Sequence, residues 1–286
     1  MVSAMGGPNL ALCVQGRIFY SLTGFAGTKK AIGDSMLKKK SKNKIGLERK
    51  TFLMVLFAIL VFVLSTVPLI EAEENIQVKT RKILNTSKRF RIQGNLFVGS
   101  GTNHIDIGTT NDGETITLSG GGGLGASILV GYGLSSKLDI DLTAGSHVCK
   151  LSKKLSNADG SFQSVTLLST LKYKIPVGNY QHVKFGAGLG FYMSGKWDVD
   201  TKNVPGGSHL IVEYDNATGF HITGEYEGMI SSNWSWGLGL KYYIVTYNAN
   251  SATQNGVSVP VNLLISEIRE LDGGGVDFMI SVSLYF

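Results

Sequence analysis

From Phe90 to its last residue, the sequence alternates apolar and polar side chains with a period of two residues. Successive side chains of a β-strand point to opposite faces, so this period predicts strands that have one apolar face. The alternation occupies eight segments, at 90–98, 126–134, 138–144, 165–175, 183–193, 220–226, 234–244 and 276–286. The chain is therefore expected to be an all-β protein.

Short and long connections alternate between these segments. The short ones lie at 135–136, 176–180 and 231–233, and the long ones at about 99–123, 150–162, 194–218 and 247–274. Outer-membrane barrels have short periplasmic turns and longer external loops. The pattern therefore predicts an eight-stranded antiparallel transmembrane β-barrel with both termini on the side of the short periplasmic turns.

A soluble eight-stranded barrel is the alternative, because its strands also alternate but turn their apolar face inward. The polar face of the segments decides between the two, since its charges nearly cancel. It carries Arg89, Arg91, Lys172, Lys174, Lys184 and Lys241 with Asp139, Asp141, Glu225, Glu227 and Asp277. Charges in a narrow interior need partners, whereas matched charges on a solvated face contribute little. The balance favours a membrane barrel with this face inside.

Nine of these side chains are expected to form a charge network inside the barrel. They are Arg91, Asp139, Asp141, Lys172, Lys174, Lys184, Glu225, Glu227 and Lys241. Folding the third and fourth segments about their connection places Asp139 opposite Lys174. The same pairing places Asp141 opposite Lys172, and the next two segments bring Lys184 near Glu227. An eight-stranded barrel has room for side chains and little else, so we expect a filled interior.

A basic stretch followed by an apolar one precedes the barrel. Seven of the thirteen residues 38–50 are Lys or Arg, and the thirteen residues 52–64 are all apolar. This order is typical of a Sec signal peptide, expected at 36–72 with cleavage after Ala72. The alternative is an uncleaved membrane anchor, because residues 52–70 span 19 positions, which is long enough to cross a bilayer.

Translation is expected to start at Met36, or at Met54, which makes residues 1–35 a mis-assigned or unstructured extension. Residues 73–87 would be a periplasmic segment and residues 88–286 the outer-membrane barrel. The net charge of +6 divides accordingly: residues 1–72 hold 10 Lys+Arg and 3 Asp+Glu, and the rest hold 17 and 18. Because the excess of cations precedes the barrel, no nucleic-acid partner is expected.

Two stretches carry a resemblance to a known group of proteins. They are the hairpin Val130-Gly-Tyr-Gly-Leu-Ser-Ser-Lys-Leu-Asp-Ile-Asp-Leu142 and the terminal Phe278-Met-Ile-Ser-Val-Ser-Leu-Tyr-Phe286. Over about residues 88–286 the chain resembles the small eight-stranded outer-membrane proteins of Gram-negative bacteria, the OmpA-barrel, OmpX and OmpW-like group. The resemblance implies that Phe278, Leu284 and Phe286 form the C-terminal signal that the barrel-assembly machinery reads.

The sequence predicts no cofactor and no metal site. Its two cysteines, Cys13 and Cys149, are too few for a four-thiolate site, and its five histidines lie on different segments without metal-ligand spacing. The glycine-rich run 120–125 matches a dinucleotide-binding pattern in spelling alone, because an alternating strand follows where a helix is required. We interpret that run as a loop.

An enzyme is a less favoured interpretation. His221 and Thr223, with Glu225 or Glu227 nearby, are the closest approach to the His-x-Ser pair and carboxylate that lipid A deacylases use. Threonine stands in place of serine, and the parity of the strand turns His221 inward, away from lipid. We therefore expect a partnered interior histidine and no enzymatic activity.

One stretch of the fourth long loop has a helical period. Its apolar residues Val261, Leu264, Ile265, Ile268 and Leu271 follow Pro260, which can begin a helix. Two interpretations stay open for 260–271. One is a short amphipathic helix over the barrel mouth or at the lipid surface, and the other is an apolar segment packed on neighbouring loops.

Together these observations predict a monomeric outer-membrane barrel that displays its loops for surface contact or envelope integrity. The alternative is a small pore for small or hydrophobic molecules, as the resemblance to OmpW-like proteins suggests. A lipid A-modifying enzyme ranks third. The expected partners are outer-membrane lipid and lipopolysaccharide, with the Sec translocon and the barrel-assembly machinery during biogenesis.

Overall fold

The computed structural model describes residues 86–286, except for 111 and 205. The expected extension 1–35, the signal peptide 36–72 and all but two residues of the segment 73–87 lie outside the described residues. Within the described part, no helix has the length and the apolar composition needed to cross a membrane.

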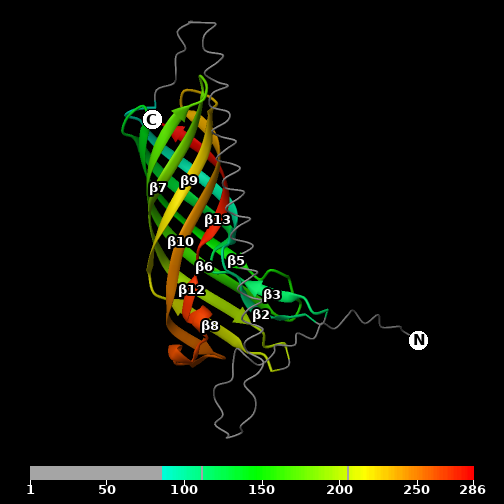
Figure 1. Ribbon diagram of the computed structural model, residues 1–286. Coiled ribbons are helices and arrows are strands. Elements are labelled where there is room, and N and C mark those ends of the chain that lie inside the picture. Colours follow the sequence, from blue (N-terminus) through cyan, green and yellow to red (C-terminus); the bar gives the residue numbers. More distant parts are fainter. Residues whose placement is uncertain (1–85, 111, 205) are drawn as a thin grey trace, which may run out of the picture. The chain divides into compact units, whose positions relative to one another are not determined.

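Eight long strands form a closed antiparallel ring (Figure 1). They are β1 (Phe90–Gly101), β4 (Gly122–Gly133), β5 (Leu138–Lys150), β6 (Asp159–Pro176), β7 (Gln181–Asp200), β9 (Ala217–Met229), β10 (Trp234–Gln254) and β13 (Gly275–Tyr285). Each strand pairs with the next in this order, and β13 pairs with β1 to close the ring. The expected eight-stranded fold is confirmed.

The long connections contain structure of their own. They hold β2 (Ile105–Thr109), β3 (Thr115–Leu118), β8 (His209–Tyr214), β11 (Val257–Ser258), the 3-10 turn η1 (Val261–Leu263), α2 (Ser266–Arg269) and β12 (Glu270–Asp272). Strands β7 and β10 also run far into the regions expected as loops, and reach 20 and 21 residues. About 9–11 residues of a tilted strand cross a membrane, so roughly half of each strand lies beyond it.

The stretch 260–271 does not form a continuous amphipathic helix. Leu264 and Ile265 have extended backbones, which separates η1 from the four-residue α2. The chain then pairs with β10 as β12. Ile268 and Leu271 are buried in the apolar core of the outer part of the molecule, so the alternative interpretation, a segment packed on its neighbours, describes this loop.

The barrel wall is apolar outside and polar inside. On β1, Leu96 is 58% exposed, whereas Arg91 is 2% exposed. The outward apolar run of β10 extends from Trp234 to Ile244, and the outward positions beyond it are polar, beginning with Thr246. This band has the length of a membrane-crossing strand and the inverted polarity that separates a membrane barrel from a soluble one. The ring is therefore a transmembrane barrel.

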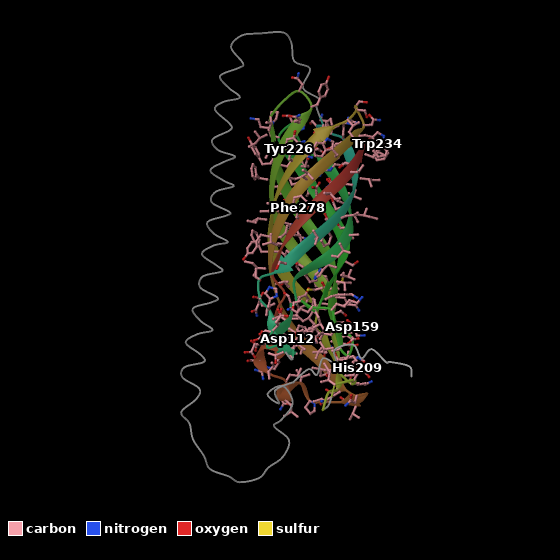
Figure 2. The ribbon with its side chains drawn as sticks, turned by 90° about the vertical axis from the view of Figure 1, so that its right-hand side faces the viewer. Asp112, Asp159, His209, Tyr226, Trp234 and Phe278 are labelled. Carbon is pink, nitrogen blue, oxygen red and sulfur yellow. The ribbon has the colours of Figure 1, made fainter. Side chains whose placement is uncertain are left out.

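We call the part of the chain beyond the apolar band, at the long-loop end, the outer head. It comprises residues 102–121, 150–162, 195–216 and 246–274. Figure 2 shows Asp112, Asp159 and His209 in this part, and Tyr226 and Trp234 toward the opposite end of the barrel. Inside the outer head the polarity is that of a soluble protein, because Phe162, Trp197 and Val212 are buried in one apolar core.

Candidate functional site in the barrel interior

The barrel interior has three layers between the short turns and the outer head. Next to the short turns lies a network of charged side chains. A polar cavity of about 40 Å³ follows in the middle of the barrel. Where the barrel passes into the outer head, the interior is filled by a cluster of aromatic side chains. We call it the aromatic cluster, and it consists of Phe162, Tyr192, Tyr214, Tyr243 and Tyr247.

The charge network contains four cations and four anions, all of them nearly inaccessible to solvent. Its closest ion pairs are Arg91–Asp141 (2.8 Å), Lys172–Asp141 (3.0 Å), Lys172–Glu225 (2.7 Å), Lys174–Asp139 (2.6 Å) and Lys184–Glu227 (2.6 Å). Unit charges of opposite sign are strongly attracted in a medium of low dielectric, and an unpaired charge there is very costly. The network is electrically neutral, so it can be buried.

The strand register differs from the expected one, although the same side chains meet. Asp139 lies opposite Lys172 in the β5–β6 ladder, not opposite Lys174, and Asp141 lies opposite Thr170. The ion pairs Lys174–Asp139 and Lys172–Asp141 are therefore diagonal, which long side chains on neighbouring strands can reach. The expected register was wrong by two residues because the length of the connecting loop was not known from the sequence.

Two expected interior cations lie outside this network. Arg89 is at the rim of the barrel, where its guanidinium donates to the carbonyl of Ser232 at 2.6 Å. Lys241 lies nearer the outer head, and its ammonium pairs with the carboxylate of Asp277 at 2.9 Å. Its ammonium also lies 4.8 Å from the centre of the Phe97 ring, a distance that permits a cation–π contact. The interior charges therefore form two neutral groups and not one.

Tyr285 is a member of the network that sequence reasoning missed. Its hydroxyl donates to Glu227 at 2.6 Å, and its oxygen accepts from Arg91 at 3.3 Å and from Lys184 at 3.2 Å. The parity of the strand could have identified it, because Tyr285 lies between Leu284 and Phe286 of the expected assembly motif and so points to the opposite, inner face. Of the motif residues, Phe278 and Phe286 are exposed on the outer face of the barrel.

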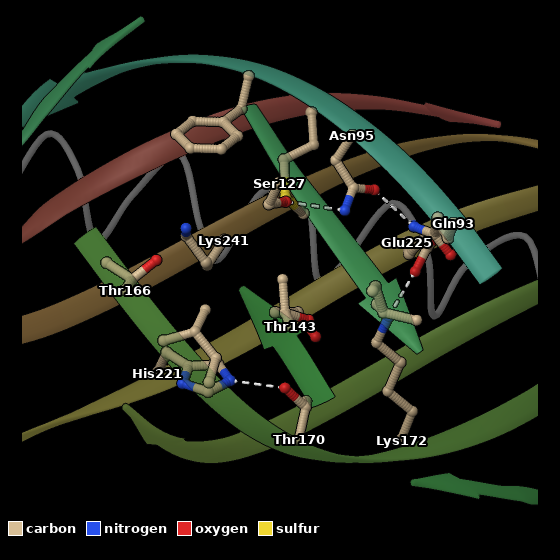
Figure 3. Close-up of a pocket in the computed structure, with 15 residues that line it drawn as sticks. Gln93, Asn95, Ser127, Thr143, Thr166, Thr170, Lys172, His221, Glu225 and Lys241 are labelled. Atoms are coloured by element: carbon tan, nitrogen blue, oxygen red, sulfur yellow. Dashed lines mark hydrogen bonds and ion pairs between the residues drawn. The ribbon is translucent and has the colours of Figure 1, made fainter. Parts of the chain in front are cut away.

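The polar cavity lies between the charge network and the aromatic cluster. Figure 3 shows the side chains that line it. Its wall includes His221, whose Nε2 lies 2.8 Å from the hydroxyl of Thr170. His221 is fully buried and faces the interior, away from the lipid side. Glu225, which also lines the cavity, accepts from the ammonium of Lys172 at 2.7 Å, so its carboxylate is engaged by a cation rather than by the imidazole. This arrangement is that of a partnered interior histidine.

The aromatic cluster closes the interior toward the outer head. The ring centres of Phe162 and Tyr247 are 5.3 Å apart and steeply inclined to one another, an arrangement that aromatic pairs prefer. The hydroxyl of Tyr214 donates to the carbonyl of Ile268 in α2 at 2.9 Å. Burial raises the pKa of Tyr214 well above its usual range, so this hydroxyl stays protonated and keeps its hydrogen bond. The cluster thereby joins the strands to the fourth loop.

The other titratable side chains of interest are dispersed. His209 pairs with Asp198 in the outer head at 2.7 Å, and Cys149 is a free, partly buried thiol at the outer end of β5. In the described part of the chain, no group of three or more His, Cys, Asp or Glu side chains is arranged to hold a metal ion.

An arginine on the lipid-facing surface should be costly only inside the apolar band. Ile128 is 63% exposed at the middle of the outward face of β4. We expect Ile128→Arg to lower the free energy of unfolding by about 2–4 kcal/mol, because the charge would lie near the bilayer midplane. Urea unfolding in lipid vesicles would measure the loss.

The matched control is Gln163→Arg, on the outward face of β6 just beyond the band. This variant is expected to lose less than about 1 kcal/mol. Equal losses in the two variants would contradict the placement of the membrane around the apolar band.

The chain matches no protein-family model and no curated protein sequence. It is similar to the outer membrane protein OprG of Pseudomonas aeruginosa, with 14% identity, a TM-score of 0.44, and coverage of 71% of this chain and 97% of OprG. It is also similar to Neisserial surface protein A, with 14% identity, a TM-score of 0.41, and coverage of 69% of this chain and 97% of that protein. A major outer membrane protein of Thermus thermophilus has 15% identity, a TM-score of 0.42, and coverage of 69% of this chain and 98% of its own.

Proposed function

We propose that this protein is an outer-membrane barrel that acts in envelope structure or in surface interaction through its outer head. The observation that carries the proposal is the closure of the interior at two levels. A neutral network of buried charges fills the lumen near the short turns, and the aromatic cluster fills it near the outer head. A barrel filled in this way has its working surface outside the lumen.

The packing of the outer head supports a role in surface contact. Ile116 of β3 and Val204 of the third long loop are buried against each other and against residues of the second loop. The backbone N–H of Ser152 donates to the carbonyl of Thr117 at 2.8 Å, which adds the second loop to the edge of the β2–β3 hairpin. Interlocked loops lose little conformational freedom when a partner binds, so they can present a defined surface.

The proposal includes the partners and the route that the sequence suggests. The apolar band would contact outer-membrane lipid and lipopolysaccharide, and the barrel would be a monomer. Export would use the Sec translocon with cleavage after Ala72. Insertion would use the barrel-assembly machinery, which would read Phe278 and Leu284 of β13 and Phe286 directly after it.

A small pore is the second candidate, and the polar cavity is the observation that favours it. The cavity leaves space in the middle of the lumen, and its wall includes Lys172, Glu225 and Lys241. In a pore, both the charge network and the aromatic cluster would have to move aside. A lipid A-modifying enzyme is less favoured, because His221 faces this cavity and not the lipid.

Conductance in planar lipid bilayers separates the two leading candidates. We expect the refolded full-length barrel to give no steady single-channel current, because ions cannot pass two filled layers. A wide porin inserted under the same conditions would show that the assay detects channels. Stable, reproducible openings of this protein would contradict the closed-interior proposal and favour the pore.

A further inference from the structure

The seam between β1 and β13 is the pairing that joins the two ends of the barrel. In its register Arg91 lies opposite Tyr285, Ile92 opposite Leu284, and Gln93 opposite Ser283. Every other pair of neighbours in the ring is joined directly by one loop or turn, which limits its register. The seam strands are separated by the rest of the barrel, so no turn sets their register.

The apolar pattern alone cannot choose the register of this seam. A slip by one residue turns the polar face of a strand toward lipid, and the free-energy cost of exposing polar side chains to lipid excludes it. A slip by two residues restores the same faces, because the side-chain period of a strand is two. Such a slip changes the stagger of the whole barrel and leaves every lipid-facing residue apolar. Another interaction has to distinguish the native register from registers shifted by two.

Both seam strands contribute to the charge network. Arg91 on β1 lies 3.7 Å from Glu227, and the hydroxyl of Tyr285 on β13 donates to the same carboxylate oxygen at 2.6 Å. Glu227 itself is held by Lys184 of β7 at 2.6 Å, across a pairing that the seam does not alter. A slip of two residues would move Arg91 and Tyr285 about 6–7 Å relative to one another, so they could no longer meet at one carboxylate.

Charge balance strengthens this requirement. Without Arg91, the remaining members are Lys172, Lys174 and Lys184 against Asp139, Asp141, Glu225 and Glu227. That leaves three cations against four anions in a buried space. An uncompensated buried charge is strongly destabilising, so a seam that displaces Arg91 leaves the interior in an unfavourable state.

We propose that Arg91 and Tyr285, meeting at Glu227, select the register in which the barrel closes. The contact is made only when the first and last strands are paired in the native alignment. The network therefore has two roles: it fills the lumen, and it stabilises the native register of the seam over shifted registers. This role does not depend on what the outer head contacts.

Disulfide trapping of the seam tests this proposal. Cysteine pairs are placed on the outward face in a full-length chain that carries Cys13→Ser and Cys149→Ser. Ile92→Cys with Leu284→Cys reports the native register. Ile92→Cys with Val282→Cys, and Gly94→Cys with Leu284→Cys, report slips of two residues in the two directions, and Gly94 has open space for a side chain.

With the network intact, we expect a cross-link in the native pair only. When Arg91→Leu or Tyr285→Phe is added, we expect at least one slipped pair to cross-link as well, in the heat-modifiable band that marks folded barrels. Tyr285→Phe keeps the ring and removes only the hydroxyl, so it covers the case in which Arg91→Leu does not fold. Met279→Leu, on the inner face of β13 and outside the network, is the matched control and should keep the native register. Folded Tyr285→Phe barrels that cross-link only in the native pair would overturn the proposal.

Discussion

Replacing Arg91 with leucine is expected to lower the free energy of unfolding of the barrel by about 3–5 kcal/mol. The guanidinium donates twice to Asp141, at 3.0 and 2.8 Å, and Asp141 has no exposed surface. Its removal leaves an unmatched negative charge in a closed interior. Urea unfolding in lipid vesicles, followed by tryptophan fluorescence and by the gel shift on heating, would measure the loss.

Arg89→Leu is the control for this variant, because Arg89 lies two residues earlier in the sequence, directly before β1. Its guanidinium is at the rim and donates to Ser232 and Asn233, so we expect a loss of at most about 1 kcal/mol. Adding Asp141→Leu to Arg91→Leu restores equal numbers of charges and should recover part of the stability. If Arg91→Leu cost no more than Arg89→Leu, the neutral network would not be what stabilises the interior.

The fold could be predicted from the sequence because a membrane barrel leaves two local signals in it, the alternation of apolar and polar residues and the charge balance of the polar face. Alternation located each strand, and the balance of charges on the polar face indicated which face is inside. The same parity predicts that Arg91, Asp141 and Lys184 share the interior face. These inferences depend on the period of a strand, which is local and does not require the register.

Features that depend on distant pairing could not be predicted in this way. The β5–β6 register differed by two residues because the side-chain pattern is unchanged by such a shift. The helical period at 260–271 was overridden by pairing of β12 with β10 and by burial of Leu271. Beyond the apolar band, strands β7 and β10 lose their simple alternation at irregularities of register, near Met193 on β7 and Ala249 on β10.

Phe162→Ala should destabilise the outer head while leaving the membrane barrel in place. Phe162 has no exposed surface and lies within 6.0 Å, between ring centres, of both Tyr214 and Tyr247. Truncating a buried phenylalanine costs about 3–5 kcal/mol through lost contacts and the cavity left behind. We expect the loops of the outer head to become sensitive to protease, while the gel shift of the folded barrel persists.

Phe191→Ala is the matched control, since Phe191 is 40% exposed on the outward face of β7 within the apolar band. It removes the same side chain from the lipid-facing surface and should leave the protease resistance of the loops unchanged. If Phe162→Ala also left that resistance unchanged, the aromatic cluster would not hold the outer head together. The loops would then be supported by their own contacts, and a partner that binds them would meet a surface independent of the barrel interior.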